Sequence, residues 1–498
     1  MGGGWRVLGA LVATFVLVLT SGPCVAGEKA AKAKPRASES GVVEAAEAEL
    51  AEAKGAKSKR SAAKPAGVRQ LSLADFVRQA LATAPEVEIA DWELAAQRSK
   101  LDEAERARFL PEAEVVSQTG IVQRARGTVL EPLDSINTDA YGPFTKVDVF
   151  LVQPIFAGGK IVAGIEAATH AVESQRAARR GVAAEVVEQV KTLYYNTLLA
   201  RSVAGIVDET SDGFASALET ARERREQGDD EISELDILYL RVGRSEVAKE
   251  LPGLRGGERS ALAALRRASG FDLDAKVDVK DRFLEVASAR LESLDVYRGR
   301  LFQQSPSWKR VDEGVAAKAS ELETVIADFY PEVFLSGGFS YSYAPERDRQ
   351  LNPFAWDDYN YLRGPGGLLG IRWGLNFHVT AARVETARAE LGKLQAEARR
   401  AETGLTLELD HAYQNVLDHR AAVEALEDGR KAGRAILTLA VTNFDIAIGD
   451  ANDVLQALGN YARVSSGYYE SVRDYDVSLA SLSRVLDEEV TDLKDELE

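Results

Sequence analysis

Two short segments in the second half of the chain alternate between apolar and polar residues. Successive side chains of a β-strand point to opposite faces, so residues 331–343 and 368–378 are each predicted to form a strand with one apolar and one polar side. Each segment has about the 9–11 residues that a tilted strand needs to cross a bilayer. The alternation therefore predicts a membrane sheet whose lipid face carries Phe339, Tyr341, Tyr343, Ile371, Trp373 and Leu375.

Very long helices are predicted next to these strands. No proline interrupts residues 159–227 or 380–448, and at about 1.5 Å per residue each helix would be roughly 100 Å long. A helix of this length is stable only if it buries a stripe along its whole length. Apolar residues recur at heptad spacing in the second helix: Val384, Ala387, Leu391, Leu394, Ala398, Ala401 and Leu405. This spacing predicts very long antiparallel coiled-coil hairpins.

The whole pattern occurs twice along the chain. Phe-Leu-Pro-Glu at 109–112 returns as Phe-Tyr-Pro-Glu at 329–332, about 220 residues later. Each copy is predicted to contain a helix, two strands, a very long helix, a turn and a returning helix. The predicted boundaries are 71–285 for the first repeat, with strands over about 111–126 and 145–156, and 286–488 for the second repeat, followed by an acidic tail at 489–498 that is expected to fray. The shorter helices are predicted over 72–109, 232–270, 306–329 and 452–487, with breaks at Pro85 and Pro252.

The N-terminal region is predicted to be a targeting segment followed by a disordered lead. Residues 1–26 contain Arg6, an apolar core and Cys24-Val25-Ala26 before a cleavage point, as in a secretory signal peptide. Lipidation of Cys24 is an alternative, which the preceding Pro23 suits poorly. Residues 27–70 are rich in Ala, Lys, Glu and Ser, a composition typical of a solvated tail. Export combined with barrel-type strands indicates the outer membrane of a bacterium, with the helices in the periplasm.

The composition argues against nucleic-acid binding and against catalysis. The 498 residues carry a net charge of −17, whereas nucleic-acid phosphates attract basic surfaces. The four histidines lack metal-ligand spacing, Gly158-Gly159-Lys160 lacks the pattern of a phosphate-binding loop, and no Gly-x-Ser-x-Gly motif occurs. We therefore predict no enzymatic activity, no catalytic residue, no cofactor and no metal site.

Four strands per chain cannot close a membrane sheet alone. Open edges would leave backbone N–H and C=O groups unpaired in hydrocarbon, so copies of the chain must complete the sheet. Two chains would give an eight-stranded barrel filled by side chains, whereas three would give twelve strands around a water-filled lumen. Water-lining side chains at Ser340, Ser342, Arg372 and Asn376 would favour a count above eight.

The duplicated plan resembles the TolC-like outer membrane efflux protein family, also called outer membrane factors. The resemblance covers about residues 71–488. It is carried by the two Pro-Glu motifs at the strand starts, by Gln153-Pro154-Ile155-Phe156-Ala157-Gly158-Gly159, and by Gly449 followed by Asp453-Val454-Leu455, although the second repeat lacks the Gly-Gly segment. It implies a mostly α protein with a membrane β-barrel part. In that family a homotrimer forms a twelve-stranded barrel in outer-membrane lipid and an α-helical periplasmic barrel, which docks onto a periplasmic adaptor and an inner-membrane transporter.

The turns between the long helices are the candidate functional elements. Gly228 and Gly449 stand where a helix ends, and glycine readily takes the left-handed backbone that such an end needs. Asp229 and Asp230 add acidic residues to the first turn. We predict that these four residues lie at the hairpin tips and contact the adaptor or the pump.

The acidic residues of the second turn have two interpretations. Asp450 can simply cap the next helix. Alternatively, three copies of Asp453, together with Asp450, would form an acidic ring that narrows the inner mouth of a trimer and favours cations. In the resembled family aspartates of this turn form the constriction, and Asp453 matches one of them best.

These features together predict the outer-membrane channel of a tripartite efflux or type I secretion system, which exports passively through a gated opening. A stand-alone outer-membrane diffusion porin is one alternative, but it would not need helices of roughly 100 Å. A periplasmic coiled-coil structural scaffold is the other, but it would not need the alternating strands.

Overall fold

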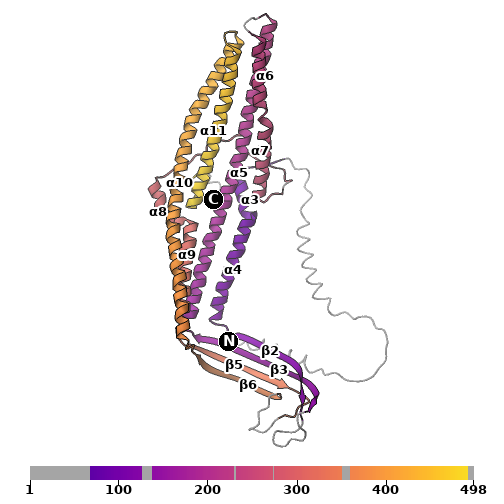
Figure 1. Ribbon diagram of the computed structural model, residues 1–498, viewed down its shortest axis with the longest axis vertical. Helices are drawn as coiled ribbons and strands as arrows, with labels where there is room; N and C mark the ends of the chain where they lie inside the picture. Colours follow the sequence, from indigo (N-terminus) through magenta and orange to yellow (C-terminus); the bar gives the residue numbers. More distant parts are fainter. Residues whose placement is uncertain (1–67, 126–136, 229–231, 273, 350–358, 492–498) are drawn as a thin grey trace, which may run out of the picture. The chain divides into compact units, whose positions relative to one another are not determined.

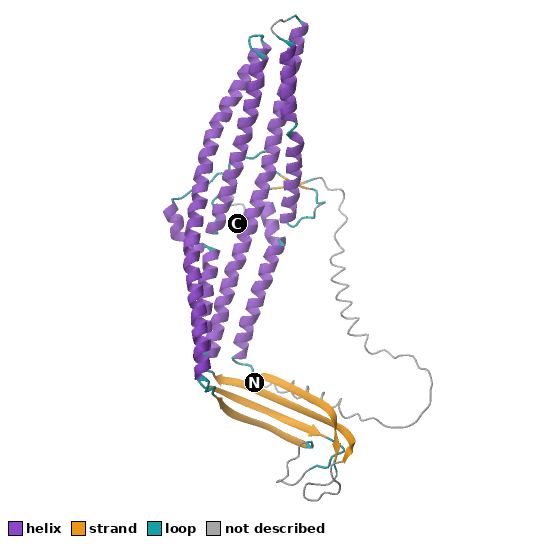
Figure 2. Cartoon of the chain, in the orientation of Figure 1, coloured by secondary structure: helices purple, strands orange, loops and turns teal. Residues whose placement is uncertain are grey.

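Residues 68–125, 137–228, 232–272, 274–349 and 359–491 are described by the computed structural model. They belong to one compact unit, Gly67–Glu498, while the other unit, Met1–Ala66, lies outside the described residues. The predicted signal peptide, including Cys24, and the predicted lead as far as residue 67 are therefore outside them as well. Within the described unit, long helices are joined to a four-stranded sheet (Figures 1 and 2).

Two uninterrupted helices are the longest elements of the unit (Figure 1). Helix α5 (Lys160–Glu226) has 67 residues and α10 (Phe377–Asp445) has 69, which gives each roughly 100 Å at about 1.5 Å per residue. Helix α10 packs along α9 (Pro306–Ile326) and α11 (Ala451–Leu486). The predicted heptad stripe lies on the packed side, because Val384 and Leu405 are buried and the stripe residues between them are half-buried. The long helices are therefore stabilised by lateral packing along their length.

Prolines divide the shorter helices of the first repeat. Helix α3 (Leu73–Thr83) begins with a capping box between Ser72 and Asp75. Ala84 then has an extended backbone, as the residue before a proline prefers, and α4 (Pro85–Ala107) starts with its proline at the first position. Helices α6 (Glu234–Ala248) and α7 (Leu251–Ala268) are separated only by Lys249 and Glu250, which keep a right-handed helical backbone, and Pro252 lies in the first turn of α7.

The four long strands form one antiparallel sheet in the order β2-β3-β5-β6. Their bounds are Glu112–Arg124 for β2, Asn137–Phe156 for β3, Glu332–Tyr343 for β5 and Tyr361–Arg372 for β6. Each repeat thus supplies one hairpin, and β3 pairs with β5 to join the two hairpins. Strands β2 and β6 are the outer strands of the sheet, and no further strand pairs with them among the described residues.

Two predicted strand boundaries were wrong. Strand β3 begins at Asn137 and not near residue 145. Its start lies beyond β5, and among the described strands only β2 pairs with it there, so Pro143 is tolerated. Strand β6 spans Tyr361–Arg372 and not 368–378, and its Pro365 lies at an irregularity in the register with β5. Trp373 and Leu375 therefore follow the strand, and α10 already starts at Phe377.

A layer of short elements surrounds the long helices near the middle of their length, and the sequence pattern did not reveal it (Figure 1). Strand β1 (Arg69–Leu71) pairs in parallel with β4 (Val277–Val279), and α8 (Leu294–Gln304) follows in the segment between the repeats. The predicted disordered lead over 27–70 was wrong at its end, because Arg69 and Gln70 are part of β1. The largest apolar core of the unit lies here and includes Phe76, Tyr194, Leu265, Leu301, Leu409 and Leu479.

The predicted acidic tail is ordered at its start. Glu489 pairs with Lys191 of α5, and Glu488 pairs with Arg300 of α8, with 3.1 Å between Oε2 and Nη1. Thr491 forms an isolated bridge with Ala289. The expectation that this acidic end frays was wrong for Glu488, Glu489 and Thr491, because contacts with the half-buried Arg300, the buried Lys191 and Ala289 hold them in place.

Candidate functional site

The sheet has one apolar and one polar face. Cross-strand pairs share a face, and the register places Phe339 opposite Val149 and Tyr341 opposite Val147. Tyr341, Tyr343 and Ile371, which alternate onto this same face, are exposed to solvent. Four of the six predicted lipid-facing residues, Phe339, Tyr341, Tyr343 and Ile371, therefore lie on one continuous apolar face of the sheet.

The other two predicted lipid-facing residues lie at the junction of sheet and helix. The Trp373 indole Nε1 donates a hydrogen bond to the Phe329 carbonyl at 3.1 Å, and the Trp373 ring packs edge-on against Phe377. Leu375 is exposed beyond the end of β6. Placing these two residues on a strand was wrong, because the turn into α10 begins directly after Arg372.

The polar face carries a network of charged and hydroxyl side chains. The Lys146 Nζ lies 2.9 Å from an Asp148 carboxylate oxygen, and Ser340 donates to the same carboxylate. Ser340 also lies 3.2 Å from the Tyr361 hydroxyl. At the end of the sheet nearer the helices, Arg372 pairs with Glu332 at 2.7 Å. Such a face is suited to contact with water in a lumen.

The two hairpin tips differ in their backbone geometry. Gly228 has a φ of 88°, so the first turn uses glycine for a left-handed residue as predicted. Gly449 does not have a positive φ, and Ala447 takes the left-handed conformation in its place, with a φ of 59°. A Cβ on Gly449 would lie 3.0 Å from the Cβ of Asn443, so this glycine allows close packing of the turn. The predicted left-handed role of Gly449 was therefore wrong. Asp229 and Asp230 lie outside the described residues.

The acidic residues of the second tip are both exposed. An Asp450 carboxylate oxygen accepts a hydrogen bond from the backbone N–H of Asn452 at 3.3 Å, as an N-cap does. Asp453 lies in the first turn of α11, where the helix dipole favours a negative charge. The structure thus shows Asp450 as a helix cap, whereas an acidic ring of Asp450 and Asp453 stays a prediction.

The two helical hairpins of the chain are joined near their tips by a buried arginine that sequence analysis did not single out. Phe214, Leu240, Phe444 and Val454 form a small apolar core between α5, α6, α10 and α11. Arg224 extends from α5 into it and donates a hydrogen bond from Nη1 to the Phe444 carbonyl at 3.0 Å. Its guanidinium also lies 5.1 Å from the centre of the Phe444 ring. Arg224 therefore links the last turn of α10 to the opposite hairpin.

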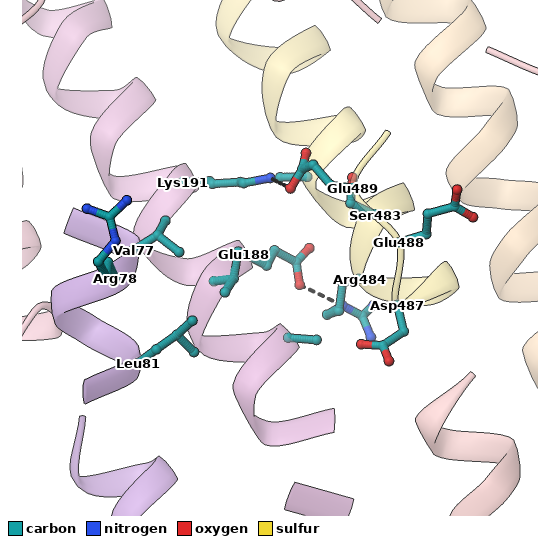
Figure 3. A pocket seen from close by; sticks show the side chains of 13 residues that line it. Val77, Arg78, Leu81, Glu188, Lys191, Ser483, Arg484, Asp487, Glu488 and Glu489 are labelled. Carbon is teal, nitrogen blue, oxygen red and sulfur yellow. Dashed lines mark hydrogen bonds and ion pairs between the residues drawn. The ribbon is translucent and has the colours of Figure 1, made fainter. Parts of the chain in front are cut away.

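A cavity of about 250 Å³ lies between α3, α5 and α11 (Figure 3). Most of the charged side chains that line the cavity form ion pairs within the protein. Lys191 pairs with Glu489, and Arg484 pairs with Glu188 at 2.6 Å and with Glu408 at 2.7 Å. Burial raises the pKa of the Asp487 carboxyl. These pairs tie three helices together, and we interpret the cavity as a structural feature.

A second buried carboxylate lies deeper in the same layer. Asp476 of α11 is 1% exposed, and its Oδ1 accepts a hydrogen bond from the backbone N–H of Ala287 at 3.0 Å. No partner for its Oδ2 occurs within the described residues. Burial raises the pKa of this carboxyl to about 7. Asp476 thus joins α11 to the segment between the repeats through a group that titrates near neutral pH.

Two searches over the described residues gave negative results. No helix there combines the length and hydropathy needed to cross a bilayer. No cluster of three or more His, Cys, Asp or Glu side chains that could hold a metal ion occurs in this part of the chain.

Comparisons with known proteins agree with the geometry. Residues 76–270 match the model of the family described as outer membrane efflux protein. No curated protein matches the chain. Among solved structures, the outer-membrane channel OprN has a TM-score of 0.67 at 17% identity, over 86% of this chain and 95% of its own. The outer membrane protein VceC of Vibrio cholerae has a TM-score of 0.66 at 16% identity, over 84% of this chain and 96% of its own. The CmeC outer membrane channel of Campylobacter jejuni has a TM-score of 0.66 at 14% identity, over 85% of this chain and 88% of its own.

Proposed function

This chain belongs to the TolC-like outer membrane efflux protein family, and from that premise we propose that three copies form a gated export channel. The protein is an efflux channel of the outer membrane, and its helical part lies in the periplasm. Members of this family work with a periplasmic adaptor and an inner-membrane pump. We propose that this chain does the same, so that the transporter supplies the energy and the channel conducts passively.

The observation that carries the proposal is that, in the part of the chain the structure describes, the sheet has no partner strand at either edge. Strands β2 and β6 are its outer strands, and its apolar face is exposed. In lipid their backbone N–H and C=O groups need partners, and a second copy can supply them by pairing its β2 with β6 of the first. Three copies of four strands give twelve, which is wide enough for a water-filled lumen, whereas eight strands would be filled by side chains.

The hairpin tips are the proposed periplasmic mouth of this channel. Each subunit contributes the exposed carboxylates of Asp450 and Asp453, so a trimer would carry six at this mouth (three copies of two residues). Closely spaced like charges favour cations in a narrow pore. We propose that the tips, with Gly228 and Gly449 in their turns, also receive the adaptor or the pump.

Replacing Asp453 with alanine is expected to lower the cation selectivity of the channel in planar lipid bilayers. The change removes three of the six proposed tip carboxylates, so the ratio of cation to anion permeability falls while the channel still inserts. Asp474→Ala is the matched control, because Asp474 is a half-buried carboxylate of the same helix far from the tip. Equal selectivity of wild type and Asp453→Ala would contradict the proposed ring.

The channel itself is tested by reconstitution and by assembly. The purified protein is expected to run as a trimer in detergent and to conduct in planar bilayers, and cross-linking in cells is expected to capture an adaptor at the tips. A monomer that needs no detergent would support a scaffold and contradict the channel. A conducting trimer without any adaptor would support a stand-alone porin.

A further inference from the structure

The segment that follows β5 folds back over the sheet. We use the name strap for Ala344–Arg349 together with Tyr359 and Asn360, the described residues between β5 and β6. Because β5 follows α9 and β6 leads into α10, the strap lies at the end of the sheet that is remote from the helices (Figure 1). In the proposed channel this is the outer end of the barrel.

The strap reaches the far outer strand of its own sheet. Glu346 forms an ion pair with Arg124 at the end of β2, with 3.0 Å between Nη2 and Oε1. Arg347 donates to the Gln123 carbonyl at 2.8 Å and forms an isolated bridge with Ala125. In the sheet order, β3 separates β2 from β5, so the strap must cross over β3 to make these contacts.

The contacts with β3 and β5 identify the face that the strap covers. A Cβ on Gly142 would lie 2.7 Å from the Cβ of Glu346, so the strap packs directly on the backbone there. The Phe144 and Tyr359 rings are 5.5 Å apart at 79°. Ser342 is 1% exposed and donates to the Tyr359 carbonyl at 3.0 Å. Gly142, Phe144 and Ser342 all alternate onto the polar face of the sheet.

The strap is held by its own hydrogen bonds as well. The Asn360 side chain accepts from the backbone N–H of Ala344 at 2.8 Å and donates to the Arg347 carbonyl at 2.7 Å. The Arg347 guanidinium lies over the Tyr359 ring, 4.1 Å from its centre. These contacts make the strap a folded structure with polar and charged side chains on the water-facing side of the sheet.

We propose that three straps, one per subunit, fold into the lumen and narrow the outer mouth of the channel, where they limit the size of the solute that leaves. This inference rests on the proposed function, since the polar face becomes a lumen only when copies of the sheet close into a barrel. The Arg124–Glu346 ion pair fastens the strap to β2, and its release lets the strap move away from the polar face.

A charge swap across this ion pair tests the inference in planar bilayers. Arg124→Glu and Glu346→Arg each place like charges together, and each is expected to raise the single-channel conductance. The double variant Arg124→Glu/Glu346→Arg restores opposite charges and is expected to return to the wild-type value. Glu332→Gln is the matched control, because it removes a paired carboxylate from the same face at the other end of the sheet. Unchanged conductance in both single variants would overturn the inference.

A thiol buried under the strap supplies a second readout. The chain has one cysteine, so Ser342→Cys in a Cys24→Ser background gives a single thiol beneath Tyr359. A bulky, membrane-impermeant maleimide added from outside is expected to modify it about two- to fivefold faster when Arg124→Glu is also present, as expected for release of a partly exposed ion pair. Equal rates with and without Arg124→Glu would contradict the strap.

The two levels of the proposal fail in different ways. A wild-type protein that forms no conducting trimer would contradict the proposed channel. If the wild-type channel conducts normally but the charge-swap variants have the same conductance and thiol reactivity as the wild type, the strap alone is contradicted.

Discussion

Replacing Arg224 with alanine is expected to raise the open probability of the reconstituted channel by roughly 30- to 150-fold. The guanidinium donates to the Phe444 carbonyl and packs on the Phe444 ring, so it fastens the last turn of α10 to α5. A hydrogen bond from a charged donor to a buried carbonyl contributes about 2–3 kcal/mol, and its loss leaves the carbonyl without this donor. We propose that the periplasmic mouth opens when the two helical hairpins separate, and in that case the loss favours the open state. Single-channel recording in planar bilayers measures the open probability directly.

The neighbouring arginine provides the control for this experiment. Arg225 lies on the surface and pairs with Glu234, so Arg225→Ala removes the same charge from the same turn without touching the tip core. Its open probability is expected to match the wild type, because exposed ion pairs contribute little. Arg224→Lys keeps the charge and is expected to fall between wild type and Arg224→Ala. Channels of Arg224→Ala that stay closed as often as the wild type would show that Arg224 does not hold the mouth shut.

Replacing Asp476 with asparagine is expected to remove a pH dependence from the stability of the protein. Burial raises the pKa of the folded carboxyl from its usual 3.8 to about 7, so the folded protein binds more protons than the unfolded chain between these values. The contribution of Asp476 to the free energy of unfolding is therefore greatest below about pH 4 and falls as the pH rises toward 7. The full loss amounts to about 4 kcal/mol. Asparagine cannot ionise, and its amide oxygen can still accept from Ala287.

Thermal unfolding of the purified protein by circular dichroism between pH 4 and pH 8 measures this effect. The Tm of Asp476→Asn minus the Tm of wild type is expected to increase as the pH rises, and to become constant above about pH 7. Asp474→Asn is the control, because the side chain of Asp474 is 42% exposed and pairs with Arg473 at 2.8 Å. A Tm difference that stays constant over the range would rule out titration of Asp476 as its source.

The sequence pattern was informative wherever one physical rule dominated a segment. Heptad spacing from Val384 to Leu405 predicted the packed stripe of α10, since a helix of 69 residues takes most of its stability from a buried stripe. Alternation from Val333 to Tyr343, broken only by Phe334, predicted the two faces of β5. By contrast, the alternation that continued to Phe377 was misleading, because Trp373 and Leu375 follow the same pattern as β6 although the backbone has already left the sheet.

The candidate site was less accessible from sequence because its key contacts join distant segments. Arg224 continues the buried stripe of Phe214, Ala217 and Ala221 at helical spacing, and this spacing is a signal for a buried position. Spacing alone does not distinguish Arg224 from Arg225, which is also one helical turn from Ala221. Asp476 meets Ala287 across 189 residues, and Glu346 meets Arg124 across 222. No local pattern contains such pairs. The left-handed backbone of Ala447 could not be predicted either, because glycine adopts this conformation more readily and Gly449 follows two positions later.

The matched lengths of α5 and α10 restrict how this architecture can be resized. One extra residue rotates everything beyond it by about 100° and turns a buried stripe toward water, whereas seven extra residues leave a rotation of only about 20°. Each neighbouring antiparallel helix must lengthen by the same rise to keep its contacts. A relative adapted to a wider gap between its two membranes should therefore differ by whole heptads inserted at the same height in both hairpins, and isolated insertions should be confined to the tips and the strand connections.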